Sequence, residues 1–227
     1  MTVHLGGGGD EHDEALLWDE VFLPGRRVAL WPFAMAPGAQ RDGSVRWFRA
    51  ALAARGEFTV QAWGVGEDDE DDGDGDLTGV DVVAVPGGNT FDLAREIRQR
   101  GLWPPLRTFL DGGGLVYGGS AGAVLLGADI AIAEGLDPNH AGVTDTLGFD
   151  RVAGAVLRPH HEPSLTAELR HWSRSRGRVV IGLPERSGLV SDGTRARAVG
   201  PEPLHLFTPD GADRELPAGT TWRLTGG

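Results

Sequence analysis

A serine flanked by glycines stands where an apolar stretch of the sequence ends. Residues 118–122 read GGSAG, which fits the pattern G-x-S-x-G around Ser120, and the apolar run LVY precedes them. This pattern is typical of a nucleophile on a sharp strand-to-helix turn, where the residues two before and two after it lie close together. Glycine at both places relieves that clash. Ser120 is therefore a candidate nucleophile for acyl transfer, and the alternative is a glycine-rich strand end without chemistry.

A second glycine-rich loop, PGGN at residues 86–89, follows the apolar run VDVVAV of residues 80–85. In a parallel sheet the carboxyl ends of the strands share one edge, and ligands bind beyond that edge. The backbone amides of Gly88 and Ala121 would then both reach a developing oxyanion. The alternative for Gly88 is a plain strand-to-helix turn.

Two adjacent histidines, His160 and His161, follow the apolar run VAGAVL. Adjacent side chains on an extended chain diverge and no third ligand stands nearby, so a metal site is disfavoured and a general base for Ser120 fits better. We expect the remaining histidines on the surface or on helix faces: His4, His12, His140, His171 and His205.

Charge and composition exclude several classes of protein. The chain of 227 residues has a net charge of −12 and no cysteine. It therefore has no basic stripe for nucleic acid or anionic membranes, no disulfide, no thiolate nucleophile and no thiolate-bound zinc. No apolar run is long enough to span a bilayer, and the acidic first 25 residues do not resemble a secretion signal. We expect a cytoplasmic protein.

The elements that must position these residues alternate between strand and helix. Apolar runs predict strands near residues 2–5, 26–34, 58–64, 80–85, 115–119 and 178–183. The segments between them predict helices, including 90–101 capped by Thr90 and 164–177 capped by Ser164. This alternation predicts an α/β fold with a doubly wound, mostly parallel sheet. Short segments in residues 187–225 predict antiparallel strands at the C-terminus. We expect one domain over residues 1–227.

One stretch is compositionally unusual. Eight acidic residues lie between Glu67 and Asp76. Like charges at this density predict a solvated, mobile loop. A calcium site is the alternative, although the stretch lacks the spacing and terminal glutamate of an EF-hand.

The segments PGGNTFDL, GGSAGAVLLG and LRPHH, in this order, resemble the peptidase E and cyanophycinase family of serine peptidases. The opening VHLGGGGDE is similar to that family's first strand and glycine loop, and the resemblance covers roughly residues 2–192. It implies a fold related to class I glutamine amidotransferases, with serine in place of cysteine. It also implies cleavage of short peptides or isopeptides without a metal or organic cofactor.

The resemblance also implies roles for particular residues. Ser120 is the nucleophile, His160 the base, and Gly88 and Ala121 supply the oxyanion amides. His161 then stands where members often carry an aromatic residue, and we expect it in the substrate pocket together with Asn89. Arg158 is either a ligand for a substrate carboxylate or a surface arginine.

The third member of the triad is where the family divides. Peptidase E takes an aspartate about 15 residues after the serine, a region that holds Glu134 and Asp137 here. Cyanophycinase-like members take a glutamate from a segment similar to GLPERSGLVSDG, which holds Glu185. We favour Glu185, because it lies just beyond the predicted strand of residues 178–183, and keep Asp137 and Glu134 as alternatives.

We therefore expect a serine peptidase of the dipeptidase or aminopeptidase type that works through a Ser-His-Glu/Asp triad and an acyl-enzyme. A cyanophycinase-like isopeptidase, an amidase or esterase, and an inactive peptide-binding module are the alternatives. The expected partner is a small peptide substrate, and the chain is also a candidate homodimer.

Overall fold

A computed structural model describes residues 2–65 and 75–224. Its larger sheet has eight strands in the order β12-β9-β8-β1-β5-β4-β2-β3. The five strands from β1 to β3 in this order run parallel, and β8, β9 and β12 extend the sheet antiparallel beyond β1. The strands are β1 (Thr2–Gly6), β2 (Arg27–Leu30), β3 (Thr59–Ala62), β4 (Val82–Val85), β5 (Leu115–Gly119), β8 (Gly188–Ser191), β9 (Arg195–Val199) and β12 (Thr221–Arg223).

Helices cover both faces of the parallel part of this sheet, because its strands are apolar on both faces. On β4, Val82 and Ala84 pack with α1 (Ala15–Val21) and α2 (Ala39–Ala53). Val83 and Val85, which point the other way, pack with α3 (Thr90–Gln99), α4 (Trp103–Asp111) and α5 (Ala121–Leu126). The expected α/β fold with a doubly wound, mostly parallel sheet is therefore confirmed.

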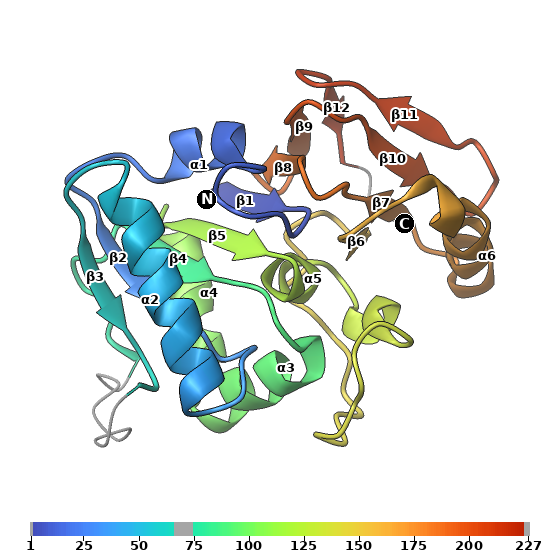
Figure 1. The fold of residues 1–227 in the computed structure, drawn as a ribbon. Coiled ribbons are helices and arrows are strands. Elements are labelled where there is room, and N and C mark those ends of the chain that lie inside the picture. The colour runs from blue at the N-terminus through green and yellow to red at the C-terminus, as the bar shows by residue number, and fades with distance from the viewer. Residues whose placement is uncertain (1, 66–74, 225–227) are drawn as a thin grey trace.

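A second sheet of four strands lies beside the first (Figure 1). It has the order β11-β10-β7-β6, and its strands are β6 (Val156–Arg158), β7 (Val180–Gly182), β10 (Leu204–Phe207) and β11 (Arg214–Leu216). The parallel pair β6 and β7 is joined by α6 (Thr166–Arg176). The strand near residues 178–183 thus belongs to this sheet and not to the larger one.

Both sheets contribute to one apolar cluster. Leu5 and Val116 of the larger sheet belong to the same cluster as Leu157, Ile181 and Leu206 of the smaller one. This shared core supports one domain over residues 1–227, which stays a prediction. Most of the acidic stretch, and with it the choice between a mobile loop and a calcium site, lies outside the described residues. Within the described residues, no helix is long and apolar enough to cross a membrane.

Candidate active site

Ser120 occupies a sharp turn between β5 and α5. Its φ is 48° and its ψ is −109°, a conformation that non-glycine residues rarely adopt. A Cβ on Gly118 would lie 2.7 Å from the backbone of Gly122, and one on Gly122 would lie 2.1 Å from the carbonyl oxygen of Val85. The glycines on either side of Ser120 are therefore required by close backbone approaches, as the G-x-S-x-G pattern predicts.

Ser120, His160 and Glu185 form a continuous chain of hydrogen bonds. The distance from Ser120 Oγ to His160 Nε2 is 2.8 Å, and that from His160 Nδ1 to Glu185 Oε1 is also 2.8 Å. An ionised carboxylate only accepts, so Nδ1 donates to Glu185 and Nε2 of the neutral ring accepts from the Ser120 hydroxyl. This arrangement can move a proton from the hydroxyl to the imidazole.

The two sheets together bring these three side chains to one place. Ser120 follows β5 in the larger sheet, whereas His160 follows β6 in the smaller one. The ladder between β6 and β7 continues past the strands, since His161 N donates to Leu183 O at 3.0 Å. Glu185 comes next along the chain, just before β8, which runs antiparallel to β1 and so begins at the edge where β1 ends. The strand pair β6 and β7 therefore carries the histidine and the glutamate to the serine.

A pocket of about 250 Å³ opens beside the serine, and it is lined by Gly88, Thr90, Ser120, Ala121, Val124, Leu136, Asp137, Pro159 and His160. Gly88 has a φ of +138°, and a Cβ there would lie 2.3 Å from the carbonyl oxygen of Ala34. Within the described residues, the amides of Gly88 and Ala121 donate to no protein acceptor. Two free N–H groups beside a serine hydroxyl can stabilise negative charge on a carbonyl oxygen.

The alternative acids make other contacts. Asp137 lines the pocket, and its Oδ2 accepts from the amide of Thr90 at 2.9 Å. Glu134 pairs with Arg176, with 3.7 Å between Oε2 and Nη2. Of the three carboxylates predicted from the sequence, Glu185 is the one hydrogen-bonded to the His160 ring.

Three residues expected in the substrate pocket lie elsewhere. Asn89 begins α3: its Oδ1 accepts from the amides of Phe91 and Asp92, both at 2.9 Å, and its Nδ2 donates to Pro138 O. It therefore replaces Thr90 as the helix cap.

His161 and Arg158 are each 5% exposed. The ring of His161 packs 4.5 Å from that of His205, and burial, His205 and Arg158 together lower the pKa of His161 to about 4. Its low exposure makes Arg158 a buried arginine and not a surface one, with its Nη2 atom 4.0 Å from Glu168 Oε1.

The other histidines divide in two. His12, His140 and His171 are exposed, as predicted. His4 is 4% exposed within β1, and His205 lies on β10 against His161, so neither matches the prediction of a surface or helix-face position. Within the part of the chain that the structure describes, no cluster of three His, Asp or Glu side chains is arranged to hold a metal ion.

Two further features of the site were not predicted. The glycine loop (residues 6–9) passes between His160 and the segment that carries Glu185: Gly9 N donates to Glu185 O at 3.2 Å. Beneath it lies Glu14, which is 1% exposed, and burial raises the pKa of Glu14 to about 7. Glu14 stands in an acidic segment whose other carboxylates suit a solvated helix face, so its burial was not predicted. The glycine loop itself was expected only from the resemblance of VHLGGGGDE.

Comparisons with known proteins identify the family and the fold of this chain. The model of peptidase family S51 matches residues 6–199. Peptidase E from Citrobacter koseri is 31% identical over 143 residues, and peptidase E from Escherichia coli is 28% identical over the same length. Each match covers 58% of this chain and 60% of the relative.

Among solved structures, the crystal structure of a peptidase from an acI-B1 Actinobacterium has a TM-score of 0.70 and 19% sequence identity. That match covers 98% of this chain and 96% of the Actinobacterium chain, and it shows the shared fold. Because the family model spans most of the sequence, including Ser120, His160 and Glu185, the chain belongs to peptidase family S51.

Proposed function

We propose that this chain is a serine peptidase that cleaves short peptides, with Ser120 as nucleophile, His160 as general base and Glu185 as the residue that orients the imidazole. The observation that carries the proposal is the continuous hydrogen-bond chain from Ser120 through His160 to Glu185, 2.8 Å at each step. Membership of family S51 and the peptidase E relatives support the same activity.

In the proposed reaction Ser120 Oγ attacks the carbonyl carbon of the scissile bond while His160 Nε2 takes the hydroxyl proton. The carbonyl oxygen becomes an oxyanion and receives hydrogen bonds from the amides of Gly88 and Ala121. His160 then gives its proton to the leaving amine, and the acyl group stays on Ser120. A water molecule, deprotonated by His160, releases the acyl group and restores the serine.

A short peptide is the substrate that fits the site best. The pocket beside Ser120 has a volume of about 250 Å³, which accommodates one or two residues. Its walls combine the apolar side chains of Val124, Leu136 and Pro159 with the carboxylate of Asp137. This size supports the proposed dipeptidase or aminopeptidase activity.

A fluorophosphonate probe together with a panel of dipeptides varied at the first position tests the proposal. Wild type should react with the probe and hydrolyse members of the panel, and Ser120→Ala should lose on the order of 10⁶ in turnover. Ser164→Ala, which removes an exposed serine outside the pocket, is the matched control and should behave as wild type.

Different outcomes separate the alternatives. Labelling without dipeptide hydrolysis, but with cleavage of β-aspartyl-arginine or of simple amides, would favour an isopeptidase or amidase. A wild-type protein that binds dipeptides yet neither reacts with the probe nor turns them over would be an inactive peptide-binding module, and the proposal would be wrong.

A further inference from the structure

The glycine loop contacts all three residues that the proposed function uses. Each contact is a hydrogen bond between backbone groups, so it fixes the position of the main chain that carries the side chain. The bonds are Ser120 N to Gly6 O (3.3 Å), His160 N to Gly7 O (2.8 Å) and Gly9 N to Glu185 O (3.2 Å). The loop is therefore the common support on which the serine, the histidine and the glutamate are assembled.

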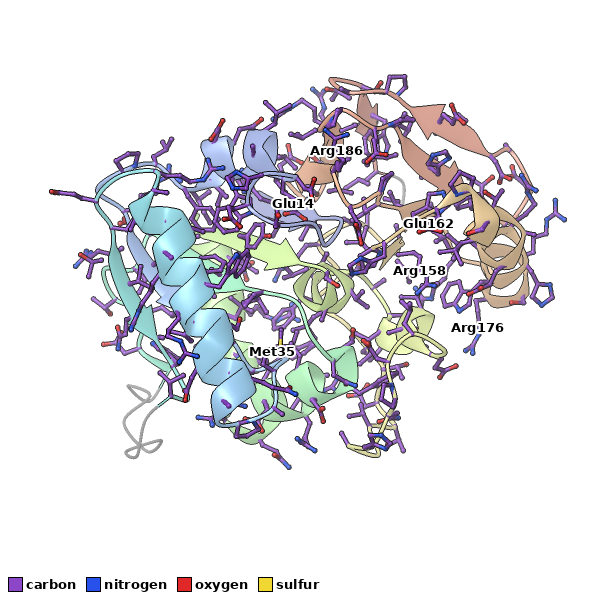
Figure 2. All side chains as sticks on the ribbon, viewed as in Figure 1. Glu14, Met35, Arg158, Glu162, Arg176 and Arg186 are labelled. Atoms are coloured by element: carbon purple, nitrogen blue, oxygen red, sulfur yellow. The ribbon has the colours of Figure 1, made fainter. Side chains whose placement is uncertain are left out.

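The loop is tied in turn to a buried carboxylate. The amide of Gly8 donates to Glu14 Oε1 at 2.8 Å. The second oxygen, Oε2, accepts from the hydroxyl of Tyr117 at 2.8 Å, and Tyr117 lies on β5 three residues before Ser120. Figure 2 shows Glu14 beside β1, inside the molecule. Glu14 thus links the loop to the strand that carries the serine.

Gly8 also lies directly against the imidazole of His160. A Cβ on Gly8 would be 2.4 Å from Cε1 and 2.5 Å from Nε2 of the ring, and the φ of Gly8 is +103°. The position of this glycine therefore limits where the ring can sit. Any shift of the Gly8 main chain would change the contact of Nε2 with Ser120.

Burying Glu14 is costly, because a carboxylate removed from water needs compensating partners. Among the described residues no arginine or histidine pairs with it, and its side chain does not cap α1. Its carboxylate accepts hydrogen bonds from the Gly8 amide and the Tyr117 hydroxyl. The hydrogen bond to Gly8 therefore suggests that Glu14 holds the glycine loop in place.

We propose that Glu14 is a positioning residue: its carboxylate holds the Gly8 amide, and through it the glycine loop that seats the His160 imidazole between Ser120 and Glu185. This inference rests on the proposed function for its kinetic consequences. The role is structural support of the reacting groups, since Glu14 is buried and does not line the pocket.

Two substitutions separate the hydrogen bond from the charge. Glu14→Met removes the acceptor of the Gly8 amide at similar length and should lower kcat by about 10²-fold with KM changed less than about threefold, because a shift of about 1 Å in a reacting group has this cost. Glu14→Gln keeps an oxygen for Gly8 and lets its NH₂ group donate to the Tyr117 oxygen, so kcat should stay within about fivefold of wild type.

Ser173→Ala is the control for burial. Ser173 is fully buried on α6, and its hydroxyl donates to Arg178 O at 2.7 Å with Phe207 O as a second, longer contact at 3.2 Å. It belongs neither to the glycine loop nor to the pocket beside Ser120. It should lower stability without lowering kcat. If Glu14→Met does not fold, Glu14→Asp replaces it: its shorter carboxylate cannot reach Gly8, and kcat should fall at least tenfold.

A measurement on the ring separates this inference from the proposed function. The Cε1–H resonance of His160, assigned by its absence in His160→Gln, should move in Glu14→Met but not in Glu14→Gln. If wild type proves inactive, this signal still tests Glu14. Unchanged kcat and an unchanged His160 signal in a folded Glu14→Met, or a hundredfold loss in Glu14→Gln, would overturn the inference.

Discussion

At the scale of single residues, two of the four non-glycine residues with a positive φ among the described residues lie where the chemistry is proposed. Ser120 and His160 have φ values of 48° and 53°, in a region that costs a non-glycine residue of order 1–3 kcal/mol. Each amide bonds to the glycine loop, which holds the main chain in this conformation. The strained pair thus points Oγ and Nε2 at each other.

The choice of the orienting acid leads to a first prediction at this scale. Glu185→Gln should lower turnover by hundreds-fold or more, up to about 10⁴, because the amide no longer fixes the tautomer or stabilises the imidazolium. Asp137→Asn and Glu134→Gln should stay within about tenfold, since their carboxylates bond to Thr90 and Arg176 instead. Turnover of one dipeptide at one pH, with folding checked by circular dichroism, gives the ranking. The reverse ranking would mean that Asp137 or Glu134, and not Glu185, orients the His160 imidazole.

The contact between Gly8 and the imidazole gives a second prediction. Gly8→Ala would place a methyl group within 2.5 Å of His160 Cε1 in a conformation that alanine rarely adopts, so the ring must move. Turnover should fall by at least about 10²-fold. Gly25→Ala is the matched control, because Gly25 also has a positive φ, of +88°, but open space around its Cβ. Equal activity of the two variants would contradict the role of Gly8.

The sequence identified some of these residues and not others, for physical reasons. Ser120 and His160 follow apolar runs and stand in recognisable motifs, so their positions at strand ends were predictable. Glu14 was not, because nothing local distinguishes a buried acid from the solvated acids around it. The same holds for His161, whose burial depends on β10, a strand more than 40 residues away in the chain.

At the scale of elements, the apolar runs predicted the strands but not which sheet each one joins. The segment of residues 178–183 is apolar in either sheet, and its partners β6 and β10 are set by tertiary packing. We expected Glu185 at the edge of the same parallel sheet as Ser120, directly after the strand of residues 178–183. That reason was wrong, because this strand belongs to the smaller sheet. Glu185 reaches His160 from the segment between β7 and β8, because β8 runs antiparallel to β1 and begins at the edge where β1 ends.

Helix ends were predicted less well than helix positions, and they provide a third prediction. Asn89→Ala removes the acceptor for two amides of α3 and the contact with Pro138, so the free energy of unfolding should fall by about 1–2 kcal/mol. Ser164→Ala should change it by less than about 0.5 kcal/mol, because Ser164 lies in a short 3₁₀ turn before α6 and does not cap that helix. Urea denaturation measures both. Equal effects would contradict the assignment of the cap.

At the scale of the whole molecule, three buried groups couple folding to pH. Burial lowers the pKa of both His4 and His161 to about 4. Each histidine therefore adds stability above its ordinary pKa of 6.5, and this stability is lost as the pH falls towards 4. Glu14 acts in the opposite direction, because burial raises the pKa of its carboxyl from 4.5 to about 7.

The opposite sign for Glu14 gives the last prediction. Between pH 4.5 and 7 the folded protein binds the Glu14 proton more tightly than the unfolded chain does. The protonation of Glu14 therefore adds to the free energy of unfolding, and this added stability is fully present below pH 4.5 and is lost as the pH rises through 7. The amide side chain of Glu14→Gln does not titrate. The contributions of His4 and His161 are the same in both proteins, so they cancel when the free energy of unfolding of wild type is subtracted from that of the variant. Relative to wild type, the variant should therefore gain roughly 2.5 kcal/mol in free energy of unfolding between pH 5 and pH 8. Urea denaturation at both pH values measures this gain, and a difference that stays constant with pH would mean that Glu14 ionises as it does in the unfolded chain.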